Sequence, residues 1–269
     1  MKLLKMILIA LLALVAVLYG ATELNLRLSG KQEGPRIQCD SQVLEISVRD
    51  GEDALLAGVT AADKQDGDLT DRVQILSVSK LITGDTAKVT YLVFDSDDNM
   101  HSLTRQIHYT DYKKPVFSID QPLVYAKNEA IALLDRLTVM DVLDGDITDS
   151  VRVSTLSATS DSEVYTVSLQ VTNSMGDTAR VTLPVILQES TSYRPEIHLS
   201  RQLVYLERGA AFSAASYVVG VTYPGGRGET TDVQIASDVD TQNPGIYMVY
   251  YRYPHNGTVG LSILTVVVE

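Results

Sequence analysis

Three similar segments follow one another along this chain at a constant spacing. Each segment begins at a proline, and these prolines, Pro35, Pro115 and Pro195, lie 80 residues apart. After each proline come a short strand-like run, a turn and a longer run in which apolar and polar residues alternate. Self-similarity at a fixed period indicates repeated structural units. The chain is therefore predicted to fold as three consecutive domains of similar structure.

The longer runs predict β-strands. Residues 88–94, 165–171 and 245–251 show the two-residue alternation that places one row of side chains in a core and the other in water. Turn clusters rich in Asp, Asn and Gly separate the runs, as is typical of β-sandwich domains. The predicted fold class is all-β, with three tandem immunoglobulin-like β-sandwiches after an N-terminal transmembrane or signal helix.

The joints between the repeats are short, and each leads into a proline. Because a proline restricts the residue before it to extended geometry, we expect a rod of limited flexibility. The predicted organisation is a signal-anchor helix at residues 1–21, a juxtamembrane linker at 22–34, immunoglobulin-like domain 1 at 35–111, domain 2 at 115–189 and a divergent domain 3 at 195–269.

The N-terminal segment predicts export of the body of the chain. Lys2 and Lys5 precede an apolar run at residues 6–19, and positive charge on that side keeps the N-terminus in the cytoplasm. The run is shorter than the ~20 residues of a spanning helix, but Lys5 can snorkel. Leu18 and Tyr19 are poor cleavage-site residues, which favours a single-pass membrane anchor with an extracytoplasmic body. The alternative is secretion after cleavage of a signal peptide.

An acidic loop precedes the long strand of the first repeat. Residues 62–70 follow the pattern A-D-x-x-D-G-D-L-T, and a T-Y-x-V-x-D-x-D-D-N strand and turn at 90–99 and then Arg105 come after it. This combination resembles a bacterial immunoglobulin-like module, the family named for a pesticidal crystal protein's Ig-like domain and related to hyalin-type repeats. Asp98 stands where that family has glycine, and the third repeat keeps mainly the P-G-x-Y pattern at 244–247. The resemblance implies a bacterial cell-surface or secreted setting and no enzymatic activity.

The acidic loops also suggest a calcium site. Ca²⁺ takes six to eight oxygen ligands, which clustered Asp side chains supply. The competing interpretation is that each Asp accepts hydrogen bonds from its own turn, and the lack of a D-x-D-x-D-G spacing favours it. The calcium candidates are Asp63, Asp66, Asp68 and Asp95 in the first repeat and Asp141, Asp144 and Asp146 in the second.

The third repeat differs most from the others. It lacks the acidic loop, carries a Y-P-G-G-R-G segment at residues 223–228 and is rich in tyrosine. Tyr and Arg are enriched in recognition surfaces, although alternate tyrosines of a strand also fill cores. The distal domain is therefore the predicted binding region. The candidate binding residues are Tyr223, Arg227, Tyr251 and Tyr253.

Catalysis has little support in the sequence. The four histidines are dispersed, and no G-x-S-x-G, H-E-x-x-H or glycine-rich phosphate loop occurs. A net charge of −12 argues against nucleic acid as a partner, and the single cysteine, Cys39, excludes an intrachain disulfide. The sequence predicts a membrane-anchored, non-enzymatic interaction or adhesion protein with an extracellular protein or glycan as partner. The alternatives are a passive stalk or spacer and a subunit of a surface complex.

Overall fold

The computed structural model describes residues 11–21, 34–159, 161, 163–189 and 193–269. Residues 11–21 are helical and exposed. In the part of the chain that is described, no helix has both the length and the apolar content needed to cross a membrane. The first ten residues of the predicted signal-anchor helix, and all but the last residue of the predicted linker, lie outside the described residues.

Each repeat contributes, within the described residues, seven strands and two short helices in the same order. The first repeat comprises β1 (Arg36–Cys39), β2 (Val43–Ile46), α2 (Glu52–Leu55), β3 (Val59–Asp63), β4 (Gly67–Asp68), η1 (Thr70–Arg72), β5 (Gln74–Val78), β6 (Thr86–Phe94) and β7 (Met100–Tyr109). The second comprises β8 (Val116–Ile119), β9 (Val124–Ala126), η2 (Leu134–Arg136), β10 (Leu137–Asp141), β11 (Gly145–Asp146), η3 (Thr148–Ser150), β12 (Arg152–Ala158), β13 (Val164–Thr172) and β14 (Thr178–Gln188). The third comprises β15 (Glu196–Leu199), β16 (Leu203–Leu206), η4 (Ala214–Tyr217), β17 (Val218–Tyr223), β18 (Gly226–Gly228), η5 (Thr230–Asp232), β19 (Gln234–Ala236), β20 (Gly245–His255) and β21 (Thr258–Val268).

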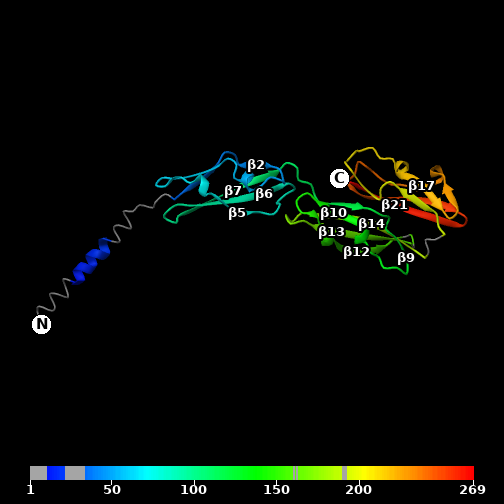
Figure 1. The fold of residues 1–269 in the computed structure, drawn as a ribbon, viewed down its shortest axis with the longest axis horizontal. Coiled ribbons are helices and arrows are strands. Elements are labelled where there is room, and N and C mark those ends of the chain that lie inside the picture. The colour runs from blue at the N-terminus through cyan, green and yellow to red at the C-terminus, as the bar shows by residue number, and fades with distance from the viewer. Residues whose placement is uncertain (1–10, 22–33, 160, 162, 190–192) are drawn as a thin grey trace, which may run out of the picture. The chain divides into compact units, whose positions relative to one another are not determined.

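The strands of each repeat form one three-stranded and one four-stranded sheet (Figure 1). The three-stranded sheets have the orders β1-β3-β4, β8-β10-β11 and β15-β17-β18. The four-stranded sheets have the orders β2-β7-β6-β5, β9-β14-β13-β12 and β16-β21-β20-β19. In the second and third repeats, the short strand that begins the four-stranded sheet runs parallel to the last strand, as β9 does to β14. The chain is thus mostly β, with three pairs of sheets that fit tandem β-sandwiches.

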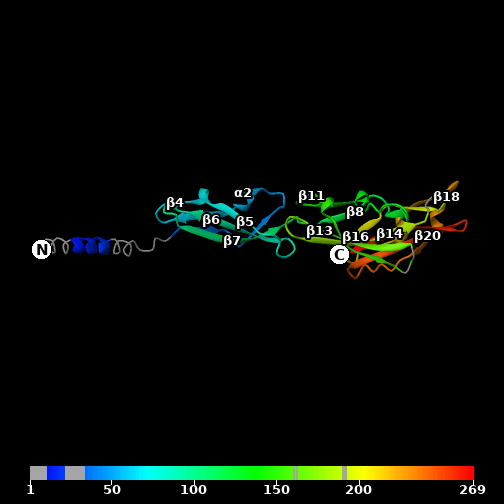
Figure 2. The ribbon, with the colours of Figure 1, turned by 90° about the horizontal axis from the view of Figure 1, so that it is seen from below.

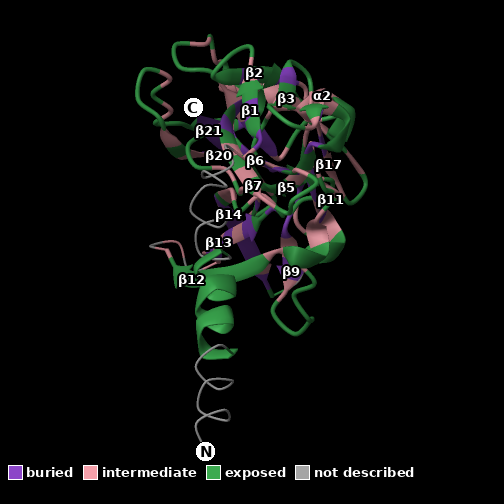
Figure 3. Cartoon of the chain, turned by 90° about the vertical axis from the view of Figure 1, so that its left-hand side faces the viewer, coloured by how far each residue is buried: buried purple, intermediate pink, exposed green. Residues whose placement is uncertain are grey.

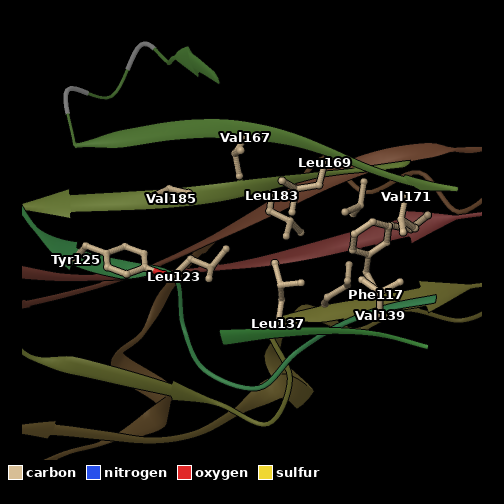
Figure 4. Packing of buried hydrophobic residues seen from close by; sticks show 13 residues of the cluster. Phe117, Leu123, Tyr125, Leu137, Val139, Val167, Leu169, Val171, Leu183 and Val185 are labelled. Carbon is tan, nitrogen blue, oxygen red and sulfur yellow. The ribbon is translucent and has the colours of Figure 1, made fainter. Parts of the chain in front are cut away.

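The core of the second repeat lies between its two sheets (Figure 4). Leu169 of β13 and Leu183 of β14 face Phe117 of β8 and Leu137 and Val139 of β10. All five side chains are almost completely buried. Burial of apolar surface contributes roughly 25 cal/mol per Å², so this layer is a main source of the repeat's stability.

Strand β14 buries both of its faces. Leu183 and Val185 face the core of the second repeat, whereas the neighbouring Ile186 belongs to a separate cluster with Val164 of β13 and Ile263 of β21. Strand β21 is likewise buried along almost its whole length, whereas β7 of the first repeat retains exposed positions along most of its length. Figure 3 shows the contrast between buried β14 and the fully exposed β12.

The second and third repeats therefore pack sheet against sheet. Strands β14 and β21 lie side by side in Figures 1 and 2. At one edge of this contact Arg194 makes a bidentate ion pair with Glu163, with both N–O distances 2.7 Å. At another, the backbone N–H of Phe117 donates to the hydroxyl of Tyr205 at 3.3 Å. The contacts extend across the sheets, so the two repeats form one compact unit.

The predicted rod is wrong for this pair of repeats. A short joint limits how far two domains can separate, but it does not keep them end to end. Apolar side chains on the outer faces of β14 and β21 would cost free energy in water, and packing the two sheets together removes them from it. The apolar outer faces, and not the length of the joint, determine the arrangement.

Tyr205 makes this packing sensitive to alkaline pH. Burial raises the pKa of Tyr205 from 10.0 to about 12, although the N–H of Phe117 partly opposes the shift. A raised pKa in the folded state contributes stability below pH 10 that is lost as the pH rises through about 12. We expect a falling melting temperature between pH 10 and 12, with a smaller fall in Tyr205→Phe. Calorimetry at a series of pH values measures the melting temperature. An equal fall in melting temperature with pH for the natural chain and for Tyr205→Phe would contradict this expectation.

Candidate functional site

Hydrogen bonds within the acidic loop of the first repeat, and from the turn between β6 and β7, hold that loop in place. The Asp63 carboxylate accepts the backbone N–H groups of Gln65 and Asp66 at 2.7 and 3.0 Å. The Asp66 carboxylate accepts the N–H and the hydroxyl of Ser96 at 2.6 and 2.7 Å. Gly67, the first residue of β4, has a φ of +76°, which a residue with a side chain rarely adopts. The loop geometry therefore explains both the carboxylates and the glycine.

The other two candidates of this repeat also accept hydrogen bonds close by in the sequence. Asp68 accepts the backbone N–H of Thr70 at 2.9 Å, and the hydroxyl and N–H of Thr70 hold the pKa of Asp68 below its ordinary value. Asp95 accepts the N–H groups of Asp97 and Asn99 at 2.9 and 2.8 Å. The structure therefore brings Asp66 to the turn that follows Asp95 and leaves Asp68 facing Thr70.

The second repeat reproduces this geometry. Asp141 accepts the N–H groups of Leu143 and Asp144 at 2.9 and 3.0 Å, and Asp144 accepts the N–H and hydroxyl of Ser174 at 2.6 and 2.7 Å. Asp141 is 5% exposed, and its other oxygen accepts the side-chain amide of Asn173 at 3.1 Å. The recurrence of the same bonds 78 residues later follows from the repeated loop.

Asp146 completes the correspondence with the first repeat. It accepts the N–H and the hydroxyl of Thr148 at 2.9 and 2.6 Å, and these donors lower the pKa of Asp146. Across the described residues, no group of three or more His, Cys, Asp or Glu side chains could hold a metal ion. Bonds within their own turns account for five of the candidate carboxylates, whereas Asp66 and Asp144 accept Ser96 and Ser174 of a neighbouring turn.

Calcium is therefore expected to leave the stability of the chain unchanged. Each of the seven carboxylates already accepts N–H or O–H donors, which compete with a cation for its oxygens. We expect the same melting temperature in 1–5 mM Ca²⁺, on the order used to saturate weak extracellular sites, as in EDTA. Magnesium at equal ionic strength is the control. A rise specific to calcium would restore the metal interpretation.

Tyr112, in the joint before the second repeat, extends the polar cluster around Asp141. Its hydroxyl donates to Asp177 at 2.9 Å and accepts the amide of Asn173 at 3.0 Å. Burial, together with the bond to Asp177, raises the pKa of Tyr112 well above its ordinary value. This joint residue was not predicted to have a role, because a lone tyrosine in a linker carries no pattern. It fixes the start of the second repeat.

Two of the four candidate binding residues belong to the core of the third repeat. Tyr251 is fully buried and donates its hydroxyl to the carbonyl of Ala214 at 2.8 Å, and Tyr253 is 8% exposed. Their interpretation as recognition residues is wrong, because alternation along β20 turns both inward. Tyr223 is half-buried and stacks on His255 with ring centroids 3.8 Å apart, and Arg227 is exposed. Only these last two remain accessible.

A pocket of about 410 Å³ opens where the second and third repeats meet. Its walls come from the loop before β9, from η2 and the end of β14, and from β15 and β21. Pro122, Pro195 and Leu261 give it an apolar side, while Arg136 and Gln188 are among its polar residues. Small-molecule sites are typically concave, partly apolar and at least 300 Å³. This pocket is the candidate site that the packing of the repeats creates.

Arg136 is held in a fixed position at the pocket. One of its terminal nitrogens donates to the carbonyls of Pro122 and Val124 at 2.6 and 2.8 Å, and its guanidinium lies 4.2 Å from the ring centroid of Tyr125. These contacts order the side chain. They use only one terminal nitrogen of the guanidinium, and its other N–H groups are not engaged by the two carbonyls. Sequence reasoning missed this site because its residues are far apart in the chain. The one available signal was the loss of alternation near the ends of β14 and β21, where residues 183–187 and 266–268 are apolar without interruption.

No family model matches the chain, and no curated protein matches it. Among solved structures, the CBM51-2 and INT domains of Clostridium perfringens ZmpB in complex with GlcNAc share 28% identity over 33% of this chain and 22% of that chain, with a TM-score of 0.24. The lipoprotein BT2262 of Bacteroides thetaiotaomicron shares 11% identity over 86% of this chain and 98% of that chain, with a TM-score of 0.22. The protocadherin gammaB7 EC3-6 cis-dimer shares 11% over 86% and 73%, with a TM-score of 0.20. At scores this low, none of these likenesses assigns a family or a function to the chain.

Proposed function

We propose that this chain is a non-catalytic interaction protein of the cell surface, built from immunoglobulin-like domains, in which the second and third repeats together form the recognition unit. The observation that carries the proposal is the pocket between these two repeats. Several of its walls come from the strands β14, β15 and β21, which are fixed by their sheets, so much of its shape is set before any partner arrives. Preformed sites bind without first ordering a loop, which favours affinity.

The chemistry of the pocket supports binding and not catalysis. His198 shares a hydrogen bond with Thr222 at 2.8 Å, and Arg194 is occupied by Glu163. Among the residues that line the pocket, none is a cysteine, and the one serine, Ser262, makes no hydrogen bond to His198 or Glu196, which also line it. Nucleophilic catalysis requires a base within hydrogen-bond reach of the nucleophile. The lining residues are therefore suited to holding a ligand.

The setting outside the cytoplasm rests on the sequence. Lys2 and Lys5 followed by apolar residues 6–19 indicate export and support a single-pass membrane anchor. The immunoglobulin-like assignment is supported by the order of the four-stranded sheets and by the acidic loop of the first two repeats. The partner that we propose is an extracellular glycan or protein.

A binding screen tests the proposal. The body of the chain, residues 31–269, is applied to a glycan array and used in pull-down experiments with surface extracts. A specific glycan or a single protein partner supports the recognition role. Isolation within a defined complex would instead favour the subunit alternative. The absence of any partner, together with normal surface display, would contradict recognition and favour a passive stalk.

Deletion of the third repeat is a poor test of where binding occurs. Removing it would expose Ile186 and the rest of the outer face of β14. Loss of binding in such a truncation could then reflect misfolding. Point variants that leave the packing intact are required, and the residues of the pocket provide them.

A further inference from the structure

Two polar side chains that are mostly buried at the pocket lack hydrogen-bond partners among the described residues. Gln188, at the end of β14, is 5% exposed, and Ser262 of β21 is 4% exposed. Both line the pocket, and neither side chain makes a hydrogen bond to any other described residue. Neither contributes a fully enclosed atom without a partner, so their polar atoms face the open space of the pocket and are available to a ligand. Polar atoms from a molecule in the pocket would satisfy both.

Arg136 provides a cation at the same place. Within the described part of the chain it has no carboxylate partner, whereas Arg194 beside it is paired with Glu163. The two carbonyls that it contacts and the ring of Tyr125 hold the guanidinium in place without neutralising it. A half-buried cation without a counterion attracts an anion, and a guanidinium suits a carboxylate because its donors match the two oxygens.

Glu196 limits the charge of that anion. This exposed carboxylate also lines the pocket and would repel a dianion such as a phosphate ester. A ligand with a single negative charge avoids most of this repulsion, and its hydroxyl groups can donate to Glu196. The amide of Gln188 and the hydroxyl of Ser262 can each donate and accept, which matches sugar hydroxyls.

We propose that this pocket binds an acidic sugar, with its carboxylate on Arg136 and its hydroxyl groups on Gln188, Ser262 and Glu196. This inference rests on the proposed recognition role and names the ligand class for it. The volume of about 410 Å³ suits one or two sugar rings, and Pro195 and Leu261 offer an apolar surface to the face of a ring. The ligand would contact both repeats and so stabilise their packing.

The test is titration calorimetry of the full-length chain with glucuronic acid and N-acetylneuraminic acid, free and as disaccharides. Glucose is the neutral control, and inorganic phosphate is the dianion control. We expect at least one acidic sugar to bind at least about tenfold more tightly than glucose. The reason is that a hydrogen bond between the sugar carboxylate and the Arg136 guanidinium lowers the dissociation constant by about that factor. Phosphate binding equal to that of the sugars would overturn the ligand class.

Gln188→Leu separates binding from folding. It removes an amide that makes no hydrogen bond within the described residues and keeps the apolar bulk, so the melting temperature should change little. Affinity for the acidic sugar should fall about tenfold or more, and Ser262→Ala should act in the same direction. Gln234→Leu, the same change on exposed β19, is the matched control and should leave affinity unchanged.

The outcomes distinguish this inference from the proposed function. If no acidic sugar binds, or if Gln188→Leu binds as well as the natural chain, the inference is overturned. If the glycan and protein screen finds a partner whose binding Gln188→Leu does not weaken, the inference fails and the recognition role stands. If the screen finds no partner and the pocket binds no sugar, both fail.

Discussion

Replacing Ile263 with Asp is expected to lower the free energy of unfolding by about 3–4 kcal/mol, because the substitution places a charge in a closed apolar layer. Ile263 is 4% exposed and packs with Val164 and Ile186 in the cluster between the second and third repeats. Apolar neighbours surround the site, so a carboxylate there has no cation to pair with in this cluster. The sheets would separate or the aspartate would be protonated.

Urea denaturation followed by circular dichroism measures the loss, and limited proteolysis shows whether the repeats come apart. Val259→Asp is the matched control, since Val259 lies on the same strand and is 43% exposed. We expect it to cost under about 1 kcal/mol. Equal losses in the two variants would mean that the sheets do not pack as described.

Replacing Arg105 with Met is expected to destabilise the first repeat by about 2–4 kcal/mol. Arg105 is 4% exposed, and its guanidinium donates to the carbonyl of Ala57 at 2.7 Å, to Asp40 at 2.8 Å and to Ser41. Methionine fills part of the space but donates no hydrogen bond. The carbonyl of Ala57 would then lose its partner. Asp40 is largely exposed and can return to water, which limits the loss.

Arg72→Met is the control, because Arg72 is exposed in η1 of the same repeat. A surface change of this kind should alter the free energy of unfolding by under about 0.5 kcal/mol. Thermal unfolding of the full chain should therefore show an earlier transition for Arg105→Met only. An unchanged transition in both variants would show that the buried cation is dispensable for the fold.

The secondary structure was largely predictable because it depends on local pattern. The alternating runs at residues 88–94 and 165–171 lie within β6 and β13, and the run at 245–251 lies within β20. The bonds of Asp63 and Asp141 are local too, since an aspartate reaches the N–H groups two and three residues ahead whatever surrounds it. Such features need no information about distant residues.

The binding candidates were harder to predict. Tyr251 and Tyr253 are candidate binding residues in the sequence because tyrosine is common in recognition surfaces. Strand β20 carries tyrosines on both of its faces, so its sequence does not indicate which face is buried. The side chain of Tyr251 satisfies its own hydroxyl inside the core through Ala214, so its polarity was no guide to exposure. Arg136 and Gln188 had no local pattern at all.

What the sequence by itself determined is the period, the strands and the turns, because each follows from residues within about ten positions of one another. The tertiary structure alone decided that the second and third repeats pack on each other and enclose a pocket. Alternation leaves the outer face of a strand either to water or to a partner, and the free energy of burying Ile186 against Ile263 exists only once both sheets have formed.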